Sequence, residues 1–261
     1  HCISSAASDV YKRQSLSFPV GDYSRLDLRY LLKQEDLTDV SLNSSRILLT
    51  DEARGPLVTS ALGYAYNYDT RTSGLDPLGG VLLRFGQDFA GVGGDVQSIT
   101  STFTAGIERR VLNEELTLRA SFEASSLNML EDDSRVTDRY FGNNRIRGFE
   151  TNGFGPRDLT APNQDALGGN YFAGVRLESE FPLGIPNEYG LKGGLFLDAG
   201  SVWFLNDTEG TAGPVDDSFH LRAVLGFSIF WTTPLGPLRF NFTNAIVKED
   251  YDEEQNFDLT V

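Results

Sequence analysis

The sequence is poor in the residues on which disulfides, zinc sites and helical membrane spans depend. Its 261 residues include one cysteine and two histidines, so no intrachain disulfide can form and no Cys/His cluster has zinc-ligand spacing. No apolar run approaches the roughly 18 uninterrupted residues of a spanning helix. We therefore exclude structural zinc and helical membrane spans, and we expect no metal and no other cofactor.

Basic residues are also scarce. The sequence has 22 Lys and Arg against 37 Asp and Glu, a formal net charge of -15. Binding to nucleic acid needs a basic face, so nucleic acid is excluded as a partner. There is no Ser/His/Asp constellation, no phosphate-cradling loop and no isolated carboxylate dyad, and we expect that the chain is not an enzyme.

The first residues do not look like part of a folded domain. Residues 1–14 lack both the charged start and the apolar stretch of a signal peptide. They resemble translated sequencing-adapter sequence. We expect residues 1–14 to be non-native and to lie outside the fold, which leaves residues 15–261 as the native part.

Strict alternation of apolar and polar residues dominates the chain from residue 15 onward. Such alternation over short segments predicts half-apolar β-strands, including those of transmembrane barrels. The segments are 16–20, 26–32, 62–68, 81–85, 99–107, 116–122, 171–181, 195–197, 221–231, 238–242 and 257–261. The sequence thus predicts an all-β chain of about eleven strands.

The polar faces and the connections favour a membrane barrel over a soluble sandwich. The polar faces carry Arg, Asp, Glu, Asn, Thr and Gly, as expected of a lumen, rather than the Lys and Glu usual at a wet surface. Aromatic residues near strand ends predict interfacial girdles: Tyr64, Tyr66, Tyr68, Phe230 and Trp231. Short turns alternate with long polar loops, the asymmetry of periplasmic turns and extracellular loops. The turns are at Gly21-Asp22, Glu114 and Pro234 to Pro237, and the loops at 36–56, 128–167 and 204–217.

The loop at 128–167 is far longer than an ordinary hairpin loop, which predicts either disorder or function. It mixes aromatic residues and glycines with few flexible ones, so we expect it to be ordered and packed. It contains the motif Arg147-Gly148-Phe149, followed by Gly155-Pro156.

These motifs resemble those of the BamA-like outer-membrane assembly and translocation barrels, also called the bacterial surface antigen family. The resemblance covers most of the chain and extends, in order, through Gly168-Gly169-Asn170, the run 197–203 and the run 233–238. It implies a barrel in the bacterial outer membrane whose long loop folds into the lumen. It also implies that the chain is the C-terminal part of a barrel of about sixteen strands, with periplasmic POTRA repeats absent, so we expect an open sheet.

The loop arginine needs a partner if it enters the lumen. An unpaired charge away from bulk water is costly, and alternation places Glu178 and Asp198 on inward faces of the two strands after the loop. We predict an ion pair from Arg147 to one or both, with Gly148 allowing a tight backbone turn. The alternative is a solvated arginine in a mobile loop.

The resemblance implies a function as central barrel subunit of the outer-membrane protein assembly machinery. The first and last strands would pair weakly, open laterally and template the strands of a client. The last strand would form one side of this gate: Asn256, Phe257, Asp258, Leu259, Thr260 and Val261. The implied partners are unfolded outer-membrane protein clients, accessory BAM lipoproteins and outer-membrane lipids.

Other functions stay open at this point. A TamA-like barrel or a two-partner-secretion transporter shares the Arg-Gly-Phe loop. A passive porin or a barrel enzyme of the phospholipase type belongs to a different class. We interpret His220 as a strand-end polar residue, and the acidic run 249–254 as a solvated turn rather than a calcium loop.

Overall fold

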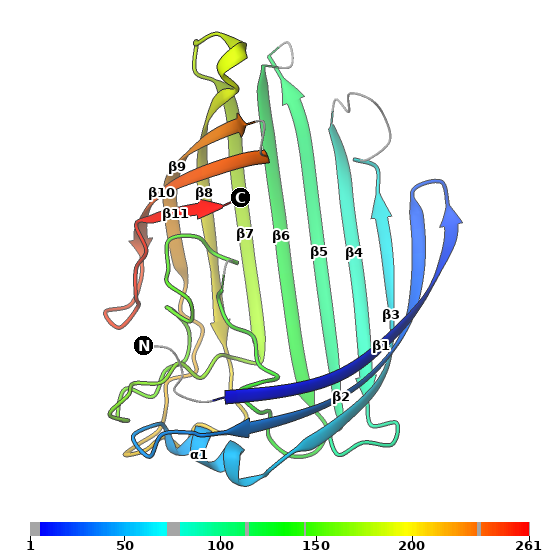
Figure 1. Ribbon diagram of the computed structural model, residues 1–261, viewed down its shortest axis with the longest axis vertical. Helices are drawn as coiled ribbons and strands as arrows, with labels where there is room; N and C mark the ends of the chain where they lie inside the picture. The colour runs from blue at the N-terminus through cyan, green and yellow to red at the C-terminus, as the bar shows by residue number, and fades with distance from the viewer. Residues whose placement is uncertain (1–5, 72–78, 113–114, 144, 234–235, 261) are drawn as a thin grey trace.

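In the part of the chain that the structure describes, eleven strands form one antiparallel sheet in chain order (Figure 1). The computed structural model describes residues 6–71, 79–112, 115–143, 145–233 and 236–260. The strands are β1 (Ala6–Gly21), β2 (Ser24–Thr38), β3 (Leu57–Asp69), β4 (Gly79–Ala90), β5 (Ser98–Val111), β6 (Leu116–Met129), β7 (Tyr171–Pro182), β8 (Leu191–Trp203), β9 (Arg222–Thr233), β10 (Gly236–Val247) and β11 (Phe257–Thr260). The helix α1 (Arg46–Ala53) and a 3-10 turn at Asn187–Tyr189 complete the elements. Within the described ranges, no helix is long and apolar enough to cross a membrane.

The sheet is strongly curved and open. Figure 1 shows β1 and β11 at its two edges, with the segment between β6 and β7 on its concave side. Short turns lie at one end of the strands, and α1 and the long connections lie at the other. The expected partial antiparallel barrel of about eleven strands is therefore confirmed, as is the open sheet.

The faces of the sheet are apolar outside and polar inside. Cross-strand pairs keep the alternation in register, as in Leu177 opposite Leu197 and Arg176 opposite Asp198. Leu195 and Leu225 on the outer face are 53% and 52% exposed, whereas the inward Asp198 is 0% exposed. A soluble sandwich buries its apolar faces, so this distribution identifies a membrane barrel wall.

The N-terminal segment differs from expectation. We expected residues 1–14 to lie outside the fold, but residues 6–14 extend β1 and pair with β2, with Ser8 opposite Asp36 and Gln14 opposite Tyr30. Strand pairing uses backbone groups that any sequence supplies, so an unpatterned segment can still extend a ladder. Its non-native origin stays a prediction.

Two further details correct the sequence analysis. The loop expected at 36–56 contains α1, which Ser45 caps by accepting a hydrogen bond from the Ile47 amide. Its Ile47 and Leu48 are buried in a cluster with Leu167, so it is not simply a polar loop. Phe230 does not join an outer aromatic girdle, because it faces inward beneath Arg239 at 4.7 Å.

The expected turns are only partly described. Gly21-Asp22 does join β1 to β2. Glu114 and the Pro234-Leu235 half of the third turn lie outside the described residues.

Candidate lumenal loop site

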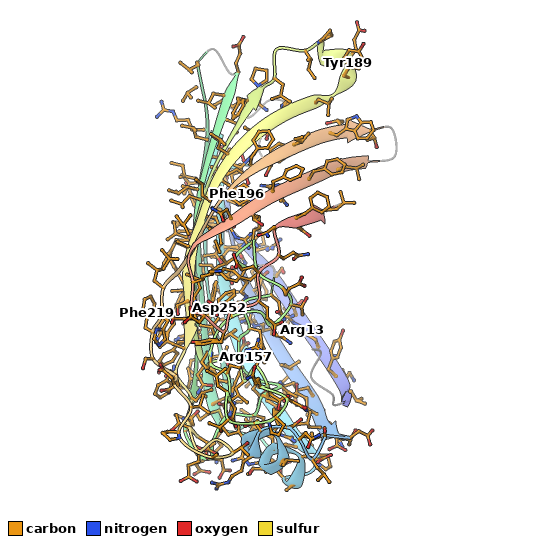
Figure 2. The ribbon with its side chains drawn as sticks, turned by 90° about the vertical axis from the view of Figure 1, so that its left-hand side faces the viewer. Arg13, Arg157, Tyr189, Phe196, Phe219 and Asp252 are labelled. Carbon is orange, nitrogen blue, oxygen red and sulfur yellow. The ribbon has the colours of Figure 1, made fainter. Side chains whose placement is uncertain are left out.

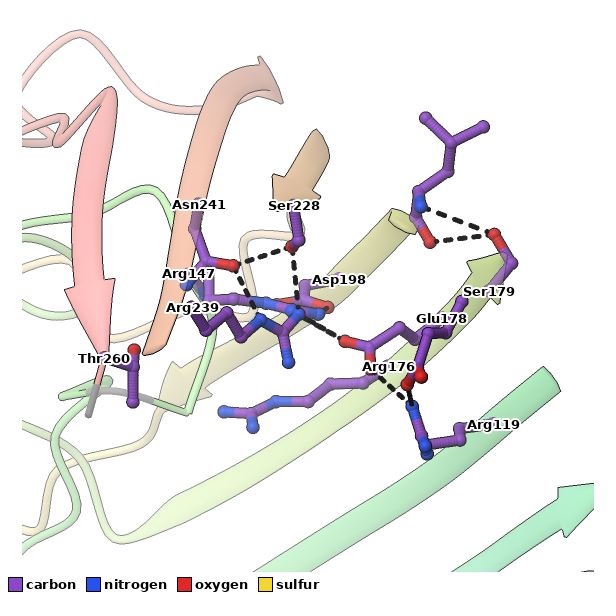
Figure 3. Close-up of polar contacts among 12 residues, drawn as sticks. Arg119, Arg147, Arg176, Glu178, Ser179, Asp198, Ser228, Arg239, Asn241 and Thr260 are labelled. Atoms are coloured by element: carbon purple, nitrogen blue, oxygen red, sulfur yellow. Dashed lines mark hydrogen bonds and ion pairs between the residues drawn. The ribbon is translucent and has the colours of Figure 1, made fainter. Parts of the chain in front are cut away.

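Arg147 lies against the inner wall of the barrel, where β7 and β8 run side by side (Figure 3). Its Nε and Nη2 donate to the two carboxylate oxygens of Asp198 at 2.7 and 2.6 Å, and its Nη1 donates to Glu178 at 2.9 Å. The backbone amide of Arg147 also donates to Asp198, at 3.2 Å. The bidentate geometry on Asp198 is the strong, directional form of an arginine-carboxylate contact. The structure thus brings Arg147 together with both carboxylates.

The same carboxylates belong to a larger charged network. Glu178 also accepts from Arg239 of β10 and, at 3.3 Å, from Arg119 of β6. The guanidinium of Arg147 stacks 3.6 Å from the ring centroid of Phe196. A buried carboxylate is tolerated only when its charge is paired. The network therefore joins β7 to β8 through Arg147, and joins β6 and β10 to β7 through Glu178.

The backbone at Gly148 explains why the motif needs glycine. Its φ is +86°, a conformation that side chains disfavour. An added Cβ would lie 2.8 Å from Val224 Cγ1 and 3.2 Å from Thr243. Phe149 is next along the loop, is buried and packs on Phe154 with ring centroids 4.9 Å apart. The motif thus packs against β9, against β10 and against Phe154 of the same loop.

Gly155 and Pro156 close the inner part of the loop. Gly155 has a φ of +113° and approaches Val202 of β8, with 3.4 Å from an added Cβ to the Val202 Cβ. The carbonyl of Pro156 accepts from the Leu167 amide at 2.9 Å. The first contact holds the loop against β8. The second joins two parts of the loop, at residues 156 and 167.

Sequence reasoning missed a strand-like pairing between the loop and the segment that leads into β11. The Glu150 amide donates to the Glu253 carbonyl at 2.9 Å, and the Glu253 amide donates to the Gly153 carbonyl at 2.8 Å. The Gln255 amide donates to the Gly148 carbonyl at 3.0 Å. No local signal could reveal this, because about a hundred residues separate the partners.

The acidic run is not a fully solvated turn. Asp252 is buried with Arg222 of β9, which donates from Nε at 2.9 Å and from Nη2 at 3.0 Å. Arg222 Nη2 also donates to the Tyr251 hydroxyl at 3.0 Å. Figure 2 shows Asp252 and Arg157 within the curve of the sheet. The interpretation as a solvated turn is wrong for Asp252, because a buried arginine on β9 needs a carboxylate partner.

A second polar junction joins three long connections at the loop end of the barrel. Asp158 Oδ2 accepts from Ser45 Oγ at 2.7 Å and from Thr211 at 2.9 Å, while Oδ1 accepts from Thr160 Oγ1 at 2.6 Å. Burial disfavours the charged form, but these hydrogen bonds outweigh it and lower the pKa of Asp158 to about 2. The loop, the cap of α1 and the β8–β9 connection are thus held by one carboxylate.

The expected gate strand lies at the edge of the sheet. Phe257 to Thr260 form β11, which pairs with β10 alone among the described strands. The Asn256 carbonyl accepts from the Thr243 amide at 3.0 Å. Val261 lies outside the described residues.

A curved antiparallel wall with an apolar exterior, and a long loop paired into its polar interior, define a transmembrane β-barrel with a lumenal loop. The Omp85 superfamily domain matches residues 10–261. The chain therefore belongs to the Omp85 superfamily, and it is an outer-membrane barrel protein.

Similar proteins agree with this assignment. The chain is 32% identical to the outer membrane protein assembly factor BamA of Neorickettsia risticii, over 92% of this chain and 31% of that protein. It is 32% identical to the human sorting and assembly machinery component 50 homolog, over 60% of this chain and 34% of that protein. The crystal structure of BamA from Haemophilus ducreyi lacking POTRA domains 1–3 has the same fold. Its TM-score is 0.79 at 19% identity, and the match covers 98% of this chain and 54% of that one.

The chain spans about a third of the length of the curated relatives it matches. The names of these relatives describe an assembly factor and a component of an assembly machinery.

Proposed function

We propose that the chain is the C-terminal barrel part of an outer-membrane protein assembly factor. Such a protein would insert β-barrel clients by templating their strands at a lateral gate. The observation that carries the proposal is the loop motif. Arg147 is ion-paired to the β7 and β8 wall, and the adjoining backbone is hydrogen-bonded to residues 253–255, immediately before the edge strand β11.

An edge strand suits this role because its backbone groups are free to pair with another chain. β11 is short, from Phe257 to Thr260, and pairs over four residues with β10. In this proposal the loop fixes the start of β11 to the barrel wall while its outer edge stays available. The clients are unfolded outer-membrane proteins, and accessory BAM lipoproteins assist the complete machine.

The names of the relatives support the class of function. The proteins named above are an outer membrane protein assembly factor and a sorting and assembly machinery component. A passive pore does not need an ion pair between a loop arginine and the barrel wall beside its edge strand. The ion pairs of Arg147 therefore favour a function in assembly over simple permeation.

The test measures the folding rate of a urea-unfolded client barrel in liposomes that contain the full natural chain. We expect the wild type to accelerate folding and Arg147→Glu to lose most of that acceleration, because a third carboxylate would face Glu178 and Asp198. The control is Arg25→Glu, a charge reversal at a lumenal arginine whose side chain is 60% exposed. Heat-modified mobility on gels reports whether each variant is folded.

The outcomes separate two claims. If the wild-type protein has no effect on the folding rate of the client, the assembly proposal is wrong. A folded Arg147→Glu variant with full activity would leave that proposal standing but remove the role of the arginine.

A further inference from the structure

The outer face of β3 to β11 carries a single charged side chain among the described strand residues, Arg109 of β5. Alternation and register place all other charged residues of these strands on the inner face. Arg109 is exposed, and no described residue forms a hydrogen bond or ion pair with it. A charged residue on a lipid-facing surface is unfavourable at the midplane and tolerated near the interface. Arg109 can therefore offer its charge to a group outside the described residues.

Arg109 lies on the rim of an apolar hollow in this outer face. The hollow has a volume of about 540 Å³, within the range of about 300–1,000 Å³ of small-molecule sites. It is lined by Ile107, Leu118, Leu177, Leu195, Leu197 and Leu225.

Two small residues on neighbouring strands make the hollow. Ala120 on β6 lies between Ile107 and Leu177 in the pairing register. Ser179 on β7 lies between Leu118 and Leu195. Short side chains surrounded by leucines leave space that a flexible hydrocarbon chain can fill.

The charge sits at the membrane boundary. Arg109 is two residues from the end of β5 at Val111, on the side of the short turns, and its neighbour on β4 is Gly79. The 3-10 turn with Tyr189 marks the same end (Figure 2). Short turns of such barrels face the periplasm. The hollow therefore extends from this boundary toward the hydrocarbon, with a cation at the level of lipid headgroups.

We propose that the outer face of β5 to β9 binds one acidic phospholipid of the periplasmic leaflet, with its phosphate on Arg109 and an acyl chain over Ala120 and Ser179. The charge selects an anionic headgroup, and the apolar lining selects a hydrocarbon chain. One basic residue at a membrane surface corresponds to about a fivefold preference for anionic lipid.

A second hollow on the same face provides an internal comparison. It has about 320 Å³ and lies toward the loop end, beside Ser101, Ala124 and Ala173. No charged residue lines it. This second hollow should accept acyl chains without a preference for the headgroup.

The test uses the full natural chain in nanodiscs with equal amounts of phosphatidylglycerol and phosphatidylethanolamine, followed by native mass spectrometry of the released protein. We expect one retained phosphatidylglycerol, favoured about fivefold. Arg109→Gln should abolish the preference and Arg109→Lys should keep most of it. Ala120→Phe should fill the hollow and reduce retention of either lipid. The controls are Arg25→Gln, a lumenal arginine, and Ala124→Phe, in the second hollow.

Three results would overturn the proposal. The first is equal retention of both lipids by the wild type, and the second is an unchanged preference for phosphatidylglycerol in Arg109→Gln. The third is an equal reduction of lipid retention in Ala120→Phe and Ala124→Phe. Release of the wild type as a dimer that Arg109→Gln converts to a monomer would also overturn it, because the face would then be an interface between copies.

Discussion

Two separate features of the structure exclude a side chain at position 148, where the chain has glycine. Its positive φ costs an L-residue about 1–3 kcal/mol when the position is enforced. The 2.8 Å approach of an added Cβ to Val224 adds a steric cost, because Val224 is fully buried and cannot move away. The residue that turns the motif toward Asp198 is therefore restricted by both backbone and packing.

We expect Gly148→Ala to destabilise the barrel by at least about 1 kcal/mol. The measurement is the temperature at which the folded form in detergent converts to the unfolded form on gels. Gly213→Ala is the matched control, because an added Cβ there meets nothing within 4 Å. Equal midpoints for the two variants would contradict the packing argument.

At the scale of elements, the segment between β10 and β11 is held by a buried ion pair with β9. Arg222 and Asp252 have side-chain exposures of 1% and 0%. Removing one charge leaves the other buried without compensation, which costs about 3 kcal/mol. Loss of the ion pair therefore destabilises the segment between β10 and β11, which precedes the edge strand.

Asp252→Asn is expected to raise the hydrogen-exchange rates of residues 249–256 by about a hundredfold, the equivalent of that cost. Asp250→Asn removes a charge from an exposed neighbour and should leave the rates unchanged. If the two variants exchange alike, the pair does not hold this segment.

The junction at Asp158 should make the packing of the long connections depend on pH. Its pKa of about 2 lies below the ordinary 3.8, a difference that corresponds to about 2 kcal/mol. A carboxyl group with a lowered pKa contributes fully above the unfolded value, so the contribution is present above about pH 4 and is lost as the pH falls through 2.

We expect pepsin to cleave within residues 130–170 more rapidly at pH 2 than at pH 4, after each rate is divided by the rate on an unfolded substrate at the same pH. Asp158→Asn should be cleaved readily at both values, whereas Asp132→Asn, at an exposed position of the same connection, should follow the wild type. A wild-type pH profile in Asp158→Asn would show that another group controls the packing.

At the scale of the whole molecule, β1 and β11 are the edges of the open sheet, and no other described strand pairs with their outer sides. Unsatisfied backbone groups in hydrocarbon cost several kcal/mol each, so exposed edges in a bilayer favour pairing with another chain. The described wall reaches stability in a membrane only when these edges are covered.

Residues 1–261 expressed alone are therefore expected to form oligomers in detergent. Size-exclusion chromatography with light scattering measures the mass. A monodisperse monomer of residues 1–261 that accelerates client folding would refute this expectation.

The sequence by itself determined the strands, their faces and the partners of Arg147. A period of two residues fixes which side chains share a face, so Glu178 and Asp198 could be placed inward before any contact was known. The expectation that Phe230 joins an aromatic girdle was wrong, because it considered only the position of Phe230 near a strand end and not the parity that puts its side chain on the inner face with Arg239.

Only the tertiary structure decided what the loop touches. The pairing of Glu150 with Glu253, the ion pair of Arg222 with Asp252 and the junction at Asp158 join segments about 30 to 110 residues apart. Irregular connections have no periodicity, and their conformation follows from whichever buried donors and charges need partners once the wall has formed. A local pattern holds no record of such long-range pairing, because the barrel wall that brings the partners together exists only in the folded chain.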